Sequence, residues 1–175
     1  AALPVTGKWS VEFTSGGPVL PAVLTLDQPE YWTAGADEAL QSFSGTATYR
    51  VAFGAPATKA PAYLVDLGKV SRSAEIWLNG KKITTLLGPV YRFVLPAAAL
   101  HQTNQLEIRV SNGMINRIIA MERQGQEWKK FYNVNFPTRL AENRDARELF
   151  TALRWQPEAS GLAGPVTLTP VNFIP

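Results

Sequence analysis

Fourteen acidic side chains are the groups of this 175-residue chain that could act as general acids, bases or nucleophiles. A glycosidase needs two carboxylates facing each other across a cleft, roughly 5 to 10 Å apart. No pair stands out by its spacing. Glu75 and Glu107 occupy outward strand positions, where we expect them to be solvated or paired with a basic neighbour such as Arg109. Asp66 is expected to hydrogen-bond the turn at Gly68. The acidic residues therefore predict no catalytic centre.

Other catalytic and metal chemistry has little support in the sequence. Ser44 has no histidine nearby that would activate it as a nucleophile. His101 is the single histidine and the chain has no cysteine, so a zinc site is not expected. We expect no cofactor, with calcium left open as an alternative. The acidic residues that would bind it match no fixed calcium-loop spacing: Asp27, Glu30, Asp37 and Glu38.

Aromatic side chains beside amides and charged groups indicate sugar binding, because a ring stacks on the C–H face of a sugar while polar groups order its hydroxyls. One such region is Tyr31 and Trp32 with Asp37 and Glu38. The preferred region comprises six residues, namely Asn112, Asn116, Arg117, Trp128, Tyr132 and Trp155. The alternative for each of the six is structural. Arg117 would then pair with a buried carboxylate, and the rings would pack this segment onto the rest of the domain.

Composition predicts one globular domain over residues 1–175, since 46% of the residues are apolar and 18% are charged. The 13 glycines and 13 prolines are scattered, which is typical of a fold with many turns. The net charge is only +3, and the densest basic cluster is Lys129-Lys130, so no nucleic-acid partner is expected. No apolar run is long enough to cross a bilayer, and no membrane partner is expected.

Short segments with strand periodicity follow one another along the chain. Apolar residues at 106, 108 and 110 alternate with polar residues at 107, 109 and 111, which predicts one buried face. Asn79-Gly80 predicts a type I′ hairpin, because both residues tolerate positive φ. The predicted strands are 9–13, 22–26, 43–51, 63–67, 74–78, 82–86, 91–95, 106–110 and 165–169. Without βαβ alternation, they predict an all-β sandwich or jelly roll.

Two segments depart from the strand pattern. Residues 36–40 are expected to form a helical turn before the 43–51 strand. Residues 113–156 are richer in charge, and we interpret them as one long loop or insertion between late strands. Apolar residues over 146–153 fit a helical stripe, but residues 149–155 also alternate like a strand, so periodicity does not choose between them. Trp77 faces outward on its strand, either as a sugar platform or, as we favour, as a contact with an adjacent domain.

An ordered set of motifs covers nearly the whole chain: Trp9 and residues 43–49, 65–68, 74–80, 104–112, 116–118 and 160–166. Together they resemble the galactose-binding-like jelly-roll (sugar-binding) domain of family 2 glycoside hydrolases. The resemblance is stronger to the related C-terminal domain of family 106 α-L-rhamnosidases. Two departures stand out. Ile118-Ile119-Ala120-Met121 replaces the family's Leu-Ile-Gly-Asp, and Thr85-Leu86-Leu87 replaces a segment that often holds tryptophan.

This resemblance implies a strand near residues 148–155 and a chain that is not catalytic by itself, because the catalytic acids of these enzymes lie in a separate barrel domain. It implies a carbohydrate-associated module that packs on the catalytic domain of the same enzyme and contributes to binding a plant polysaccharide or oligosaccharide. The alternatives are an independent carbohydrate-binding module and a purely structural interaction domain. A secreted or periplasmic location is expected. Residues 1–5 have no signal-peptide core and are expected to be a processed boundary or a linker.

Overall fold

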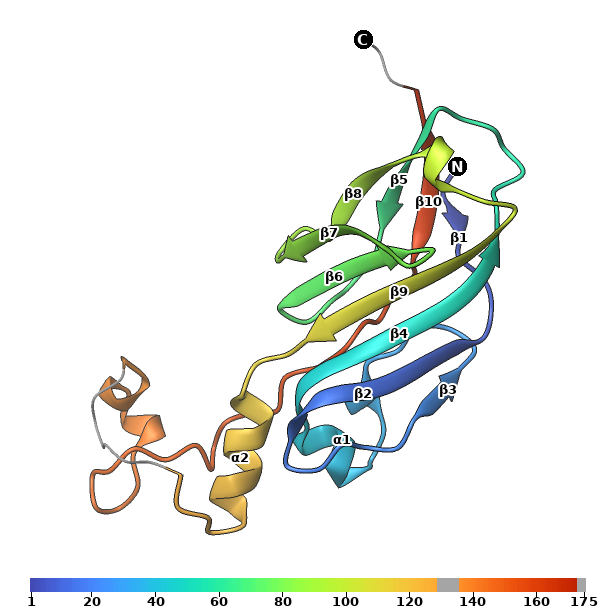
Figure 1. The fold of residues 1–175 in the computed structure, drawn as a ribbon. Coiled ribbons are helices and arrows are strands. Elements are labelled where there is room, and N and C mark those ends of the chain that lie inside the picture. The colour runs from blue at the N-terminus through green and yellow to red at the C-terminus, as the bar shows by residue number, and fades with distance from the viewer. Residues whose placement is uncertain (129–135, 173–175) are drawn as a thin grey trace.

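Two antiparallel sheets pack face to face in the computed structural model, which describes residues 1–128 and 136–172 (Figure 1). The smaller sheet has the strand order β1 (Leu3–Pro4), β10 (Thr167–Val171), β5 (Ala62–Asp66) and β8 (Arg92–Pro96). The larger sheet has the order β3 (Leu24–Leu26), β2 (Trp9–Gly17), β4 (Ser44–Gly54), β9 (Thr103–Ser111), β6 (Ser73–Leu78) and β7 (Lys81–Leu87). The predicted all-β sandwich is confirmed.

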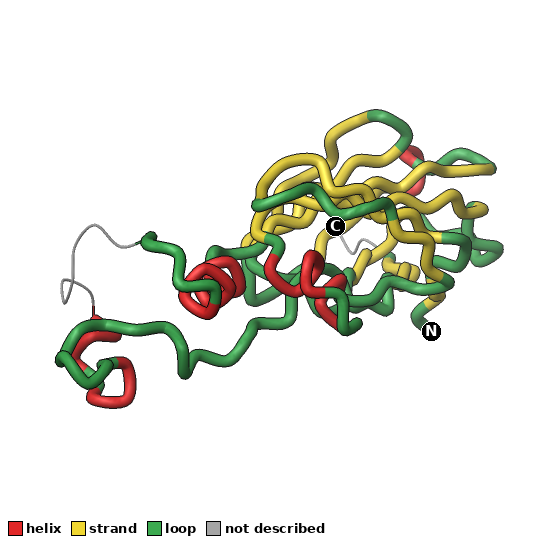
Figure 2. The backbone as a smooth tube through the Cα atoms, turned by 90° about the horizontal axis from the view of Figure 1, so that it is seen from below, coloured by secondary structure: helices red, strands yellow, loops and turns green. Residues whose placement is uncertain are grey.

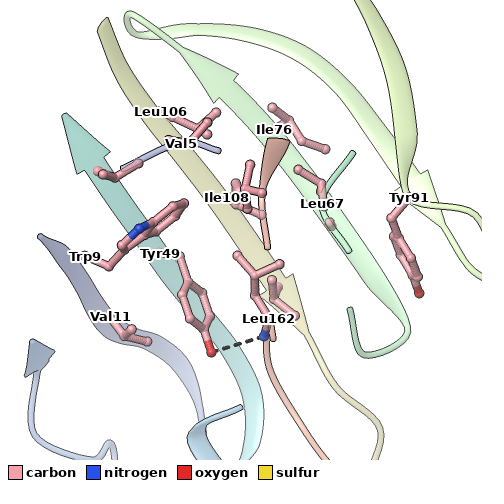
Figure 3. Close-up of a cluster of buried hydrophobic side chains, with 14 of the residues drawn as sticks. Val5, Trp9, Val11, Tyr49, Leu67, Ile76, Tyr91, Leu106, Ile108 and Leu162 are labelled. Atoms are coloured by element: carbon pink, nitrogen blue, oxygen red, sulfur yellow. Dashed lines mark hydrogen bonds between the residues drawn. The ribbon is translucent and has the colours of Figure 1, made fainter. Parts of the chain in front are cut away.

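The core lies between the sheets because each long strand alternates apolar and polar residues. In β9, Leu106, Ile108 and Val110 are buried, whereas the residues between them face outward, as predicted. Burying one such side chain stabilises the fold by about 1.5–3 kcal/mol. Figure 3 shows how residues from both sheets and from the segment before β10 meet; they include Trp9, Val11, Tyr49, Leu67, Ile76 and Leu162.

Short turns and caps close the sandwich as the sequence predicts. Asn79 and Gly80 join β6 to β7 with φ angles of 51° and 78°, which are the positive values of a type I′ turn. The Asp66 carboxylate accepts a hydrogen bond of 2.9 Å from the backbone N–H of Gly68. The helical turn predicted at 36–40 is α1 (Glu38–Ser42), capped by the Asp37 carboxylate.

Trp32 differs from the sequence interpretation, which placed it in a candidate sugar-binding region. It lies in the short 3₁₀ helix η1 (Trp32–Ala34) and is only 2% exposed. Its ring packs edge to face against Phe13 and Phe43, with centroids 5.8 and 5.9 Å away. Trp32 is therefore part of the core beneath α1 and is not available to a ligand, whereas the adjacent Tyr31 is half-buried.

Between β9 and β10 the chain leaves the sandwich. It first forms α2 (Ile115–Arg123), and the described residues of 124–157 then project from one end of the domain (Figures 1 and 2). We call residues 124–128 and 136–157 the arm. Two 3₁₀ helices lie in the arm, η3 (Phe136–Arg139) and η4 (Ala141–Asn143), whereas η2 (Ala97–Ala99) follows β8 in the sandwich.

The strand predicted at residues 148–155 is wrong. Glu148 has a positive φ of 60°, and the Trp155 N–H donates a hydrogen bond of 3.0 Å to the Ala152 carbonyl, as in a turn. Asp145 holds this segment locally, since its backbone N–H donates to the Leu149 carbonyl and its carboxylate accepts from the Leu149 N–H. The backbone hydrogen bonds of this segment are thus made within the arm rather than to a sheet edge.

Candidate functional site

The two asparagines of the predicted binding region lie together against the segment that leads into β10. Asn112 donates hydrogen bonds to the Phe43 carbonyl and the Ser160 hydroxyl, and it accepts one from the Gly45 N–H. Asn116 is 4% exposed. It donates to the Glu158 carbonyl and accepts from the Glu158 N–H, both at 2.7 Å. Both amides therefore bind backbone groups that hold the chain in place.

Arg117 follows Asn116 on α2 and is half-buried. Within the described residues, its hydrogen bond is made to the Gln126 side chain, at 3.5 Å. The pairing with a buried carboxylate that a structural role would give is not found among those residues. Arg117 thus lies in the first turn of α2, and its side chain contacts Gln126, which follows the end of the helix.

Trp128 and Trp155 are brought together by Phe150. Both indole rings meet the buried Phe150 ring edge to face, with centroid distances of 6.1 and 5.5 Å. The Trp128 N–H donates to the Glu122 carboxylate at 2.6 Å, and the Trp155 N–H donates to the Asn143 side chain at 2.9 Å. Both tryptophans remain half-buried.

These three rings form a small core of the arm, separate from the sandwich core. Tyr132, the sixth predicted site residue, lies outside the described residues. The structure thus gathers the predicted residues into an asparagine pair at the base and a tryptophan pair in the arm.

A surface groove runs beside α1, and α2 lines part of it. One of its two hollows, of about 210 Å³, is lined from both helices by residues that include Glu38, Arg123 and Gln124. The second, of about 290 Å³, is lined by Tyr31, Thr33 and Ala34 together with the 157–159 segment. The hollows share Gln41 and Pro157 as lining residues. We refer to both as the α1–α2 groove.

The groove joins parts of the two regions that were predicted from the sequence as alternative sugar-binding sites. Tyr31 and Glu38 come from the first region and Asn116 from the second. Sequence reasoning missed Arg123 and Gln124, because periodicity did not place a helix directly after β9. Their proximity to α1 follows from the packing of α2 on α1, which the sequence pattern does not encode.

Outward carboxylates of the large sheet are paired, as expected. Glu107 accepts hydrogen bonds from Arg50 and Arg109, at 2.8 and 2.7 Å. Burial raises the pKa of Glu107, but the hydrogen bonds and charges of the two arginines outweigh it, so the pKa lies below its ordinary value. Glu75 is held in the same way by Lys82, whose hydrogen bond lowers the pKa of that carboxyl. These carboxylates and their basic partners form a row of ion pairs across the outward face of the sheet and do not form an acid–base pair.

Trp77 lies within this row of ion pairs, on the outward face of β6. The Arg109 guanidinium lies 4.5 Å from its ring centroid, and the indole N–H donates to Glu75 at 3.0 Å. One ring face is thus covered by an arginine, and the ring edge is fixed.

Two of the four acidic residues considered for calcium have other partners. Asp37 caps α1, and Asp27 pairs with Lys8. Among the residues that the structure describes, no three histidine, cysteine or acidic side chains are gathered as metal ligands would be. None of the helices in the described ranges is long and apolar enough to span a membrane.

No family profile matches the chain. A protein of Formosa agariphila, described as "Putative beta-glucuronidase", is 33% identical over 94% of this chain and 15% of its own length. The structure of a rhamnosidase from a Novosphingobium species superposes with a TM-score of 0.70 and 30% identity, over 96% of this chain and 14% of that one.

A Bifidobacterium dentium β-glucuronidase shares the fold, with a TM-score of 0.51 and 21% identity over 63% of this chain and 20% of its own. This chain therefore corresponds to one region, about a seventh of the length, of much longer proteins named as glycoside hydrolases.

Proposed function

We propose that this chain is a non-catalytic accessory domain of a glycoside hydrolase, α-L-rhamnosidase-like or family 2-like. It packs on a catalytic domain and contributes to binding the carbohydrate substrate. The proposal rests on how much of each protein is matched. Nearly the whole chain matches, but it accounts for only 14–15% of the two proteins that are at least 30% identical to it. Because this region is so small a part of those proteins, the remainder can hold a separate catalytic domain.

Pairing of the outward carboxylates supports a non-catalytic role. Glu75 and Glu107 are held by basic side chains with lowered pKa values, so neither is poised as a general acid at neutral pH. Glycosidases use one carboxyl group with a raised pKa beside a second, ionised one. In this proposal, the catalytic carboxylates belong to the partner domain.

The arm is the part of the domain that we assign to the substrate cleft. It projects from the end of the sandwich (Figure 2) and carries Trp128 and Trp155, which are held by Phe150 yet remain half-exposed. An aromatic pair held in place on a projection suits the rim of a neighbouring cleft, because aromatic rings shed water readily against sugar faces. Leu140 and Leu153, which are 53% and 52% exposed, add apolar area for contact with the partner domain.

The experiment is kinetic and uses the full-length enzyme. Trp128→Ala and Trp155→Ala should each raise KM for an oligosaccharide at least about threefold while kcat changes less than about twofold, since the interaction lost is binding. The matched control is Phe93→Ala, which removes a half-buried aromatic ring from the smaller sheet, outside the arm. Equal KM values for all three variants and the wild-type enzyme would contradict the role of the arm.

We further place the enzyme outside the cytoplasm, secreted or periplasmic, as suits a protein that meets plant polysaccharide. Fractionation of the producing cell tests this. Recovery of the protein from the cytoplasm alone would overturn it.

A further inference from the structure

The α1–α2 groove is not used by the arm-based role, yet its walls carry polar groups without partners. Glu38 lies on α1 and Arg123 on α2, and both line the same hollow of about 210 Å³. Within residues 1–128 and 136–172, neither the carboxylate of Glu38 nor the guanidinium of Arg123 has a hydrogen-bond or ion-pair partner. Both residues are exposed, so two hydrated, opposite charges line one hollow and remain available to a ligand.

We propose that this groove is a binding site for a neutral saccharide and that it acts without a catalytic partner. A pyranose presents adjacent hydroxyl groups that both donate and accept hydrogen bonds. One hydroxyl would donate to Glu38 while its neighbour accepts from Arg123, so a single ring joins the two charges. Hydrogen bonds to charged groups are the stronger class, so both contacts would add to the affinity.

The floor of the groove is rigid before any ligand arrives. Asn116 holds the Glu158 backbone through two hydrogen bonds of 2.7 Å, and the Ser160 N–H donates to the Thr33 hydroxyl at 2.9 Å. On the opposite wall, the Gln41 side chain donates to the Gly35 carbonyl at 2.8 Å. Fixed walls lower the entropic cost of binding a small, weakly held ligand.

The second hollow, of about 290 Å³, extends the site beyond one sugar unit. It offers the half-buried ring of Tyr31 and the apolar ring of Pro157, which also lines the first hollow. In the described part of the chain the Tyr31 hydroxyl has no hydrogen-bond partner. An aromatic face with a free hydroxyl next to a charged hollow suits a second unit of an oligosaccharide.

Charge selects among sugars. A uronate or a phosphate ester would be attracted to Arg123 but repelled by Glu38, since both side chains line the same hollow. A neutral ring uses both groups. The inference therefore commits to neutral saccharides and predicts that charged ones bind less well.

The test is an NMR titration of the ¹⁵N-labelled 175-residue chain. The probes are cellobiose, methyl α-L-rhamnopyranoside and D-glucuronate, each added to about 50 mM, which covers millimolar dissociation constants. We expect at least one neutral probe to cause saturable shifts at the amides of Ala34, Ala120 and Gln124. Its affinity should fall at least about tenfold in Glu38→Gln and in Arg123→Ala.

Matched controls change the same residue types outside the groove. Glu142→Gln and Arg154→Ala alter exposed residues of the arm and should leave the affinity unchanged. Two-dimensional spectra of all four variants report whether the fold is intact.

Three outcomes overturn the inference: silence with every probe, shifts confined to the arm, or D-glucuronate binding more tightly than the neutral probes. None of these affects the accessory role, which is read separately from KM of the full-length enzyme.

Discussion

Replacing Asn116 tests whether the pair Asn112 and Asn116 binds a ligand or holds the backbone in place. Replacing it by alanine removes two hydrogen bonds of 2.7 Å to the Glu158 backbone and a third of 3.3 Å to Ser160. At about 1 kcal/mol net for each short bond, with a further penalty for the backbone groups left unpaired, the loss is about 2–4 kcal/mol. Alanine returns about 0.5 kcal/mol through its higher helix propensity in α2. The expected net destabilisation is about 1.5–3.5 kcal/mol.

Urea unfolding monitored by tryptophan fluorescence measures this change. With a slope of about 2 kcal/mol per molar urea, the midpoint for Asn116→Ala should fall by roughly 1 M. Asn116→Asp keeps the oxygen that accepts from the Glu158 N–H, but it puts a carboxylate into a site that is 4% exposed and sets a second oxygen against the Glu158 carbonyl, so its midpoint should also lie below that of the wild-type chain. A midpoint for Asn116→Ala within about 0.25 M of the wild-type value would refute the structural role. Asn116 would then be free to act as the ligand-binding residue that the sequence predicted.

Three further predictions concern stability. Tyr49→Phe should cost about 1–3 kcal/mol, because the buried Leu162 N–H, 3.2 Å from the hydroxyl, loses its acceptor (Figure 3); a loss below about 0.5 kcal/mol in urea unfolding would contradict this. Gly161→Ala should cost at least about 2 kcal/mol, since φ is +118° and the new methyl group would lie 2.4 Å from the Tyr49 hydroxyl oxygen. Gly35→Ala, with φ of −84° and open space around it, is the control and should be neutral or stabilising, so equal losses would refute the argument. The pKa of Glu107 is lowered in the fold, so its contribution to stability is present above its ordinary pKa of 4.5 and lost as the pH falls through the folded value. The stability difference between the wild-type chain and Glu107→Gln should therefore shrink below pH 4.5, and a constant difference from pH 7 to pH 3 would count against the ion pairs.

The sandwich was predictable because its signals are local. The alternation of β9 encodes which side chains are buried, and Asn79-Gly80 encodes a hairpin, each within a few residues. The pairing of Glu107 with Arg109 was also foreseen, since residues two apart on a strand share a face.

The arm was not predictable in the same way. Residues 148–155 alternate like a strand, but their backbone is held by Asp145 and by local turns, and no periodicity reports such contacts. The α1–α2 groove depends on two helices that are about 75 residues apart in the sequence and meet only after folding. Glu38 was noticed as a polar residue near an aromatic one, but nothing in the sequence pairs it with Arg123.

The central claim is that this chain assists a glycoside hydrolase without catalysing hydrolysis itself. The most direct measurement compares the hydrolysis of an oligosaccharide and of a p-nitrophenyl glycoside by three samples: this chain, the full-length enzyme, and the enzyme lacking this domain. We predict no turnover by the chain alone, and a KM for the oligosaccharide that rises when the domain is removed. Hydrolysis by the chain alone, or an unchanged KM without it, would contradict the account.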